Sequence, residues 1–499
     1  MTPTHSQPAA PLSAPAIVRA TVRAAGALVT RQLLGHGLNA AGAVALANLF
    51  SVEEFGIYAI VVLIWSVLYV ISDVGLGAAL VRQGEEPEPH DYRSVFTAQL
   101  LMMTTLLVLV WPLAPLLAAP YARAGDVAFI MRMAALALLP ACLQTVPSIR
   151  LERHLRFERL ALVEVGQALV FNLTAVALAW AGRGAAVSLG AALLARKIGG
   201  AVLAQAASPW APGWHFSWNR LRGLLAFGVP FQGVGVVALG KDAFIPVVAG
   251  VLAGEAAVGL LTWASWVARA PVLALFMMQR VYLPAFSRML EHRGELARFV
   301  ENVLFTANAA VAPLAVLVLL LSEHLPALVF GKQWQSAVPL VLPYWLAMLP
   351  LATAFPLFGL LGALGHARTA FVLAATQAAA VWLLGAPLTA AFGATGAAWA
   401  SVLAAPAIAA AVPIARRSVD FDVARAVVAP WSAALVCGGA LLAMRMHWPV
   451  TSVAGLMACS AAALVVYGLT IAMLAPSRAR TMLSLLTQAA APKRATGPA

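Results

Sequence analysis

The sequence predicts an all-α, polytopic membrane protein with about 14 transmembrane helices. Of its 499 residues, 62% are hydrophobic and only 10% are charged, whereas soluble domains carry about 25% charged residues. The mean hydropathy is +0.88. The stretch from Phe55 to Leu80 is the clearest single span, because its one charge is Asp73 and a helix of this length crosses a hydrocarbon core of roughly 30 Å. This composition leaves no soluble domain of ordinary size.

Similar apolar runs, separated by short polar turns, recur to the C-terminal end of the sequence. We expect transmembrane spans at about 25–48, 56–80, 95–118, 127–147, 160–180, 185–206, 223–250, 258–285, 300–321, 338–361, 369–390, 396–414, 426–444 and 452–474. No charged segment followed by a short apolar core opens the chain, so a cleaved signal peptide is not expected.

The distribution of Lys and Arg predicts the orientation of these spans. If the N-terminus lies in the cytoplasm and the sides alternate, 21 of the 32 Lys and Arg residues fall on the cytoplasmic side, four outside and seven within spans. Cytoplasmic loops of membrane proteins collect such residues. We therefore expect both termini in the cytoplasm, and the net charge of +13 does not indicate nucleic-acid binding.

The two halves of the chain look related. Residues Leu49–Ile57 align without gaps on Leu252–Leu260 at a shift of 203 positions, and both segments form the outer turn between the first two spans of their half. An even number of spans per repeat gives parallel repeats related by an axis along the membrane normal. The expected divisions are a disordered cytoplasmic tail (1–24), an N-terminal six-helix lobe (25–206), a cytoplasmic linker (207–222), a C-terminal six-helix lobe (223–414), an extra helix pair (426–474) and a second cytoplasmic tail (475–499).

Six landmarks occur in a fixed order between about residues 25 and 414. They are the opening stretch with Phe55–Tyr58, the basic loop Arg150–Ala161, the turn Ala253–Leu260, the segment Val281–Arg288, the loop Phe330–Ala337 and the turn Gly393–Ala398. In this order they resemble the bacterial polysaccharide and oligosaccharide (O-antigen) flippases, a family within the superfamily that also holds the MATE drug exporters.

This resemblance implies a MATE-like fold of two six-helix lobes around a central cavity, plus two C-terminal helices. It implies alternating access and a substrate of glycan linked through pyrophosphate to a polyprenol, exported as O-antigen, capsule or exopolysaccharide from the bacterial cytoplasmic (inner) membrane. Anionic lipids and the polysaccharide polymerase or export machinery are the implied partners. Neither an enzymatic activity nor a cofactor is expected, and the glycan is not named.

Charges within spans are the candidate functional groups, because each costs about 2.5–3.5 kcal/mol on insertion scales unless it meets water or a partner. Seven cations stand against three acids. Arg132 is expected to reach the membrane edge. The candidate ligands for a pyrophosphate are Arg31, Arg196, Lys197, Lys241, Arg269 and Arg280. Lys241 and Asp242 are adjacent, so they are expected to point to different helix faces and not to pair.

Three further groups of residues each have two possible roles. The acids Asp73, Glu164 and Asp242 are candidates for ion coupling or for salt bridges. The cytoplasmic arginines Arg150, Arg153 and Arg156 could anchor the loop on anionic lipid or receive a diphosphate headgroup. Polar amides within spans could line a sugar path or hold helices together; they are Asn39, Asn48, Gln167 and Asn172.

Two rival functions remain open at this stage. Glu53 and Glu54 superficially resemble the acidic pair of a membrane glycosyltransferase or polymerase, but the repeat has Ala256 and Ala257 at these positions. A MATE-type exporter of drug cations would need an acidic cavity. No catalytic motif and no Cys or His spacing for a metal is present.

Overall fold

A computed structural model describes residues 37–82, 86–154, 156–273 and 293–478, together with positions 35, 275, 286, 289, 290 and 480. Every regular element in these ranges is a helix. The expected N-terminal tail, most of the C-terminal tail and the candidate ligands Arg31 and Arg280 lie outside the described residues.

The first half of the chain forms seven helices among the described residues, five of them with 22 residues or more. They are Gly37–Leu49, α2 (Val52–Asp73), α3 (Leu76–Arg82), α4 (Pro89–Ala118), α5 (Ala124–Arg153), α6 (Phe157–Trp180) and α7 (Gly184–Ala207). Helix α2 begins at a capping box, in which the Ser51 hydroxyl accepts from the Glu54 amide while the Glu54 carboxylate accepts from the Ser51 amide. The polar turn expected before the second span is therefore a helix N-cap.

The second half begins with α8 (Trp218–Asp242), which leads through a π-helical turn (Ile245–Ala249) into α9 (Gly250–Arg269). The remaining α-helices of the described residues are α11 (Arg293–Leu321), α12 (Val338–Met348), α13 (Leu351–Ala363), α14 (Ala367–Ala409), the short α15 (Ala411–Arg416), α16 (Val423–His447) and α17 (Val453–Leu474).

The described residues contain 11 segments that are long and apolar enough to cross a membrane. Two of them, Gly235–Val272 and Ala367–Arg416, each cover two expected spans, and the backbone leaves helical geometry within them at Gly254 (φ 83°) and Gly393 (φ 58°). The first expected span is described only as Gly37–Leu49. The protein is thus a multi-pass membrane protein, and the count of 14 stays a prediction.

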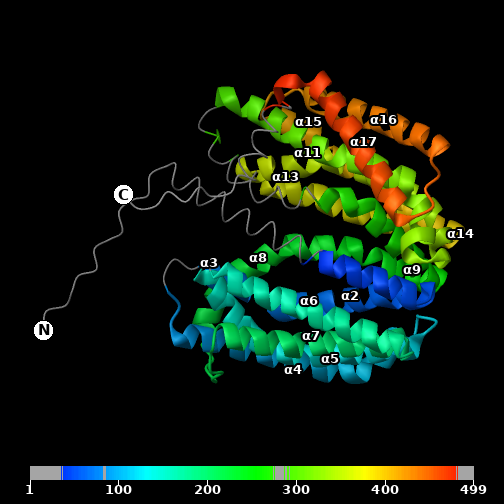
Figure 1. Ribbon diagram of the computed structural model, residues 1–499. Coiled ribbons are helices and arrows are strands. Elements are labelled where there is room, and N and C mark those ends of the chain that lie inside the picture. The colour runs from blue at the N-terminus through cyan, green and yellow to red at the C-terminus, as the bar shows by residue number, and fades with distance from the viewer. Residues whose placement is uncertain are drawn as a thin grey trace, which may run out of the picture.

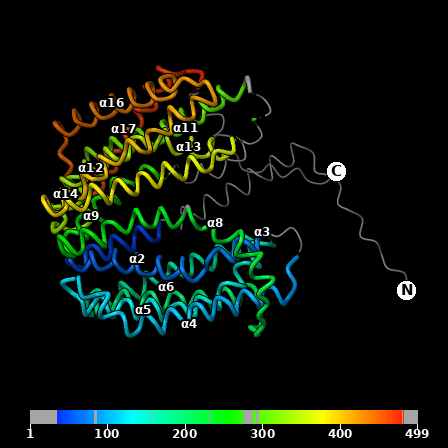
Figure 2. Tube along the Cα trace, turned by 180° about the vertical axis from the view of Figure 1, so that it is seen from behind, coloured from blue at the N-terminus to red at the C-terminus, as the bar shows by residue number. Residues whose placement is uncertain are grey.

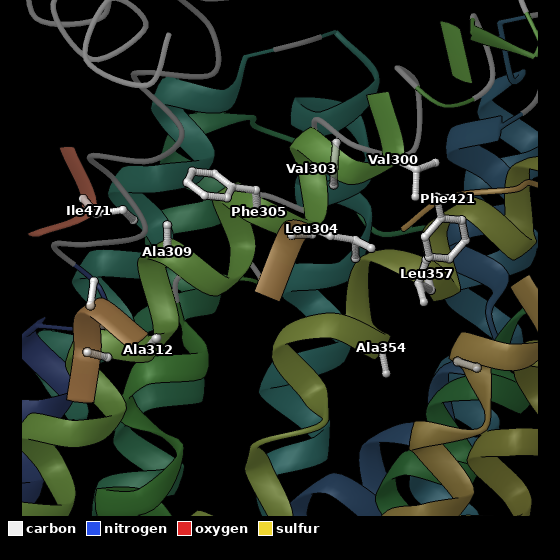
Figure 3. Packing of buried hydrophobic residues seen from close by; sticks show 14 of the residues in the cluster. Val300, Val303, Leu304, Phe305, Ala309, Ala312, Ala354, Leu357, Phe421 and Ile471 are labelled. Carbon is white, nitrogen blue, oxygen red and sulfur yellow. The ribbon is translucent and has the colours of Figure 1, made fainter. Parts of the chain in front are cut away.

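Two bundles of helices lie one above the other (Figure 1), one built from α2 to α7 and the other from α11 to α17, with α8 and α9 between them. The view from behind shows the same two layers (Figure 2). Each has its own apolar core. In the second, Leu304 of α11 belongs to the same buried cluster as Leu357 of α13 and Phe421, which lies just before α16 (Figure 3).

Helices α2 and α9 cross at a reciprocal contact between two glycines. A Cβ atom added to Gly56 would lie 2.0 Å from the carbonyl oxygen of Glu255, and one added to Gly259 would lie 2.1 Å from that of Val52. Residues 52 and 255, like 56 and 259, differ by the shift of 203 that relates the two halves. The same surface is thus used twice, as at a two-fold interface, and the repeat seen in the sequence has a structural counterpart at this crossing.

The other end of α2 is broken where it meets α8. Val74 (φ 46°) and Gly75 (φ 74°) both have left-handed backbone conformations, which is rare for a β-branched residue. A Cβ atom on Gly75 would lie 2.4 Å from the Gly228 carbonyl oxygen. Leu221 and Leu224 at the start of α8 belong to the core of the first bundle, whereas near its end Trp382 of α14 donates to the Gly240 carbonyl at 2.8 Å. Helix α8 therefore joins the two bundles.

Candidate functional site

Two candidate cations of the first bundle lie side by side on α7 and face aromatic rings. The Lys197 ammonium nitrogen is 4.4 Å from the centre of the Trp65 ring, and the Arg196 guanidinium carbon is 5.8 Å from that of Phe171. Lys197 is only 9% exposed, and the buried Nε of Arg196 has no hydrogen-bond partner among the described residues. Cation–π contacts stabilise such side chains without neutralising their charge.

Two further cations share one carboxylate between α8 and α9. Lys241 Nζ lies 2.7 Å and Arg269 Nη2 lies 3.2 Å from the same Asp242 oxygen. The expectation that Lys241 and Asp242 do not pair was wrong. Asp242 is the last residue of α8, and the long, flexible lysine side chain reaches around the helix end to its neighbour. The expected salt-bridge role of Asp242 is thus present in the structure, and the cluster keeps one net positive charge.

Tyr58 of α2 connects these two groups. Its ring is 6.3 Å from the ring of Phe171, which contacts Arg196, and 5.6 Å edge-on from the ring of Trp266. Trp266 lies one helical turn before Arg269 on α9. Arg196 and Lys197 of the first bundle and Lys241 and Arg269 of α8 and α9 are thus linked through aromatic rings. Among the described residues, the ion pairs of these four cations involve one carboxylate, that of Asp242.

The other two candidate acids differ from each other. The Asp73 carboxylate accepts hydrogen bonds from the amides of Gln99 and Gln232, each at 3.1 Å, and from the backbone amide of Gly75 at 3.3 Å. The bond from Gly75 lies just before α3, where free N–H groups need an acceptor, and no ion pair of Asp73 occurs within the described ranges. Glu164 is exposed on α6.

Two of the three cytoplasmic candidate arginines donate hydrogen bonds to backbone carbonyl oxygens of other segments. Arg150 donates to the Pro209 carbonyl at 2.9 Å, and Arg153 donates to the Leu80 carbonyl at 2.7 Å and lies 3.5 Å from Glu86. Arg156 is exposed just before α6. Of the three candidate headgroup ligands, Arg156 is thus the most exposed, while the other two hold neighbouring segments together.

Three of the four candidate polar amides connect separate segments of the chain. Asn172 donates to Asn39 at 3.3 Å, and Asn48 donates to the Val329 carbonyl at 2.8 Å. In the described part of the chain, no group of three or more His, Cys, Asp or Glu side chains could hold a metal ion.

Sequence reasoning missed the aromatic residues of this site. Phe55, Tyr58, Trp65 and Tyr69 follow one another at intervals of three, seven and four residues, which places them on one face of α2. That spacing was a usable signal, but their pairing with Arg196 and Lys197 depends on which helix faces them. The amide ligands of Asp73 were missed for the same reason.

The fold and the charged interior define a class, that of polytopic membrane proteins with two helix bundles around an excess of cations. The chain matches the family model described as "Polysaccharide biosynthesis protein" over residues 45–339. It belongs to this polysaccharide biosynthesis protein family.

Two curated relatives have the same general assignment. The chain is 29% identical over 302 residues to the succinoglycan biosynthesis transport protein ExoT of Rhizobium meliloti (strain 1021), which is 59% of this chain and 60% of that protein. It is 24% identical over 275 residues to the teichuronic acid biosynthesis protein TuaB of Bacillus subtilis (strain 168), which is 54% of this chain and 56% of that protein. The match thus spans less than two thirds of either relative.

Solved structures are similar over most of the chain. The lipid II flippase MurJ in an inward closed conformation superposes with a TM-score of 0.72, covering 89% of this chain and 98% of MurJ at 14% identity. A MATE-family multidrug resistance transporter of the MOP superfamily, in an inward-facing conformation, superposes with a TM-score of 0.63, covering 78% and 94% at 13% identity. The chain therefore shares the fold of these two proteins.

Proposed function

We propose that this protein is a flippase that moves a polyprenyl-pyrophosphate-linked oligosaccharide across the bacterial cytoplasmic membrane by alternating access. The observation that carries the proposal is the charge balance around Tyr58. Arg196 and Lys197 have aromatic neighbours in place of an acid, and Lys241 and Arg269 share the single carboxylate of Asp242. A region with this surplus favours an anionic cargo.

The chemistry of the four cations suits a pyrophosphate. A guanidinium offers planar paired donors that match two phosphate oxygens, and an ammonium adds a point charge. The buried Nε atoms of Arg196 and Arg269 have no partner within the described residues, so each guanidinium has a donor left for a ligand. Arg31 and Arg280 remain candidate ligands as well.

The two contacts of α2 suggest how access alternates. With the expected orientation, the Gly56–Gly259 crossing lies at the outer side and the Gly75–Gly228 contact lies at the cytoplasmic side. Separation of α3 from α8 would admit the headgroup from the cytoplasm, near the exposed Arg156. Separation of α2 from α9 would release it outside, while the polyprenyl tail stays in lipid.

The names of similar proteins support a role in polysaccharide export. One relative is a succinoglycan biosynthesis transport protein, and one structural neighbour is a lipid II flippase. The product would be O-antigen, capsule or exopolysaccharide, with both termini of the protein in the cytoplasm. Anionic lipids and the polymerase or export machinery would be its partners, and no enzymatic step is assigned to it.

The rival functions have less support. A drug-cation exporter needs an acidic interior, and the interior around Tyr58 has the opposite sign. For a glycosyltransferase or polymerase, Glu54 would have to be free for chemistry, but its carboxylate caps α2 and accepts from the Ala185 amide at the start of α7 at 3.3 Å.

Flipping can be measured in proteoliposomes with a fluorescent polyprenyl-pyrophosphate glycan and an impermeant quencher. The quenched fraction is expected to exceed the outer-leaflet half only when protein is present. Replacing both Arg196 and Lys197 by Gln should reduce this excess, while Arg132→Gln, at a side chain that donates to the Trp111 carbonyl, should not. Movement equal to that of protein-free vesicles would overturn the proposal.

A further inference from the structure

Asp73 is an acid within a membrane span whose partners are all neutral. Its two carboxylate oxygens accept from Gln99 of α4, from Gln232 of α8 and from the backbone amide of Gly75. None of the ion pairs found among the described residues includes Asp73. Neutral donors stabilise an ionised carboxylate but leave its negative charge uncompensated, which is costly in a membrane span.

Gln99 indicates what is missing from this site. Its side chain is 0% exposed, and while its amide nitrogen donates to Asp73, its carbonyl oxygen Oε1 has no hydrogen-bond partner in the described part of the chain. A buried polar atom without a partner calls for an explanation such as an ion. Because the terminal torsion of a glutamine is soft, the same amide can turn its oxygen toward the point that its nitrogen now occupies.

We propose that Asp73, Gln99 and Gln232 form a binding site for one monovalent metal cation, Na⁺. Hard cations take oxygen ligands, and this site can supply two carboxylate oxygens and two amide carbonyl oxygens from three helices. One carboxylate is balanced by one positive charge, whereas a divalent ion would leave an excess. Asp73 is partly exposed, which gives the ion a path of entry.

A proton is the other way to neutralise Asp73. The three N–H donors on the carboxylate stabilise the ionised form, whereas burial favours the neutral form. Tyr69, one helical turn away on α2, is a titratable neighbour of Asp73, and Lys197 lies 5.8 Å from its ring. The site is assigned to a metal ion because it offers four oxygen ligands, and protonation is a result that the experiment can distinguish.

The position of the site gives the ion a mechanical role. Asp73 and Gln99 belong to the first bundle, while Gln232 lies on α8, which joins the two bundles. The site is adjacent to the left-handed Val74 and to the close contact between Gly75 and Gly228. A bound ion would turn the two amides, so that Gln232 would no longer donate to Asp73. This would change the contact of α2 and α3 with α8. Binding of the ion does not depend on the proposed function; only its effect on transport does.

Binding can be tested on the full-length protein in nanodiscs, without any transport assay. Radioactive sodium is added to protein immobilised for scintillation proximity counting, and unlabelled NaCl competes at constant ionic strength maintained with choline chloride. We expect saturable binding that NaCl displaces and choline does not. Gln99→Met and Gln232→Met should each weaken binding at least several-fold, and Asp73→Asn should abolish it.

The control variant is Glu164→Gln, which removes an acid from an exposed position on α6 and should bind sodium like the wild type. If Asp73→Asn cannot be purified, the two Met variants test the site with the carboxylate intact. Undiminished binding in all site variants, or no saturable binding between pH 6 and 8, overturns the proposal. If stability responds to pH while sodium does not bind, the charge that neutralises Asp73 is a proton and the metal assignment is wrong.

Discussion

Replacing Gly56 by Ala should hold the two bundles apart at the α2–α9 crossing. The added Cβ atom would lie 2.0 Å from the Glu255 carbonyl oxygen, whereas ordinary contact begins at 3.4 Å. The helices must therefore separate by about 1.4 Å, the difference between these distances, since the obstacle is backbone. Overpacking of this kind costs about 1–3 kcal/mol, and a bias of that size shifts a two-state equilibrium by about 5- to 150-fold.

The separation can be measured by the distance between two spin labels across the side of the molecule that bears this crossing. Arg183, before α7, and Lys332, at the start of the 3₁₀ helix that precedes α12, are exposed positions in different bundles. With the native cysteines replaced, labels at these two positions should give longer distances in Gly56→Ala than in the parent protein. Gly468→Ala, with nothing within 4 Å of the added atom, should match the parent.

A double substitution adds a second check. Gly259→Ala creates the same obstacle from the other helix, at 2.1 Å from the Val52 carbonyl oxygen. One separation relieves both clashes, so Gly56→Ala and Gly259→Ala together should cost clearly less than the sum of the two single changes. Unchanged label distances in Gly56→Ala, or strict additivity, would refute the reciprocal contact.

Three further outcomes follow from the charged side chains. Arg196→Gln and Lys197→Gln should each reduce flipping at least tenfold in the proteoliposome assay while the protein still purifies as a monodisperse species; loss of folding would point to a packing role instead. Asp242→Asn should raise the affinity for inorganic pyrophosphate, measured by calorimetry, because it frees two cations, and weaker binding would contradict this. Arg153→Gln should lower thermal stability by about 1–3 kcal/mol, the cost of an unsatisfied buried group, whereas Arg156→Gln should leave it within about 0.5 kcal/mol; equal losses would show that exposure does not separate their roles.

The fold was largely predictable because bilayer thickness dictates the length of each apolar run. The breaks at Gly254 and Gly393 fall between expected spans, as glycines with positive φ allow. The shift of 203 was also visible, although only Leu49 and Gly56 have identical counterparts. The structure explains the identity of Gly56 and Gly259. Only glycine fits at these positions, because the carbonyl oxygens of Glu255 and Val52 lie directly against them.

The candidate site was less predictable, because pairing depends on which helix faces which. The rule that adjacent residues point apart holds inside a helix, but Asp242 ends α8 and Lys241 can reach it. Nothing in the local pattern indicated that Arg150 and Arg153 would donate to the carbonyl oxygens of segments about 60–70 residues away. In each case the partner is set by tertiary packing and not by local spacing.

The most direct test of a cationic interior is to compare two ligands that differ only in charge. Binding of a polyprenyl-pyrophosphate glycan and of the same glycan on an uncharged polyprenyl linkage can be measured on the purified protein in nanodiscs. The structure predicts that the pyrophosphate ligand binds at least tenfold more tightly and that this advantage is lost when Arg196 and Lys197 are both Gln. Equal affinity for the two ligands, or an advantage that survives the double substitution, would contradict the account.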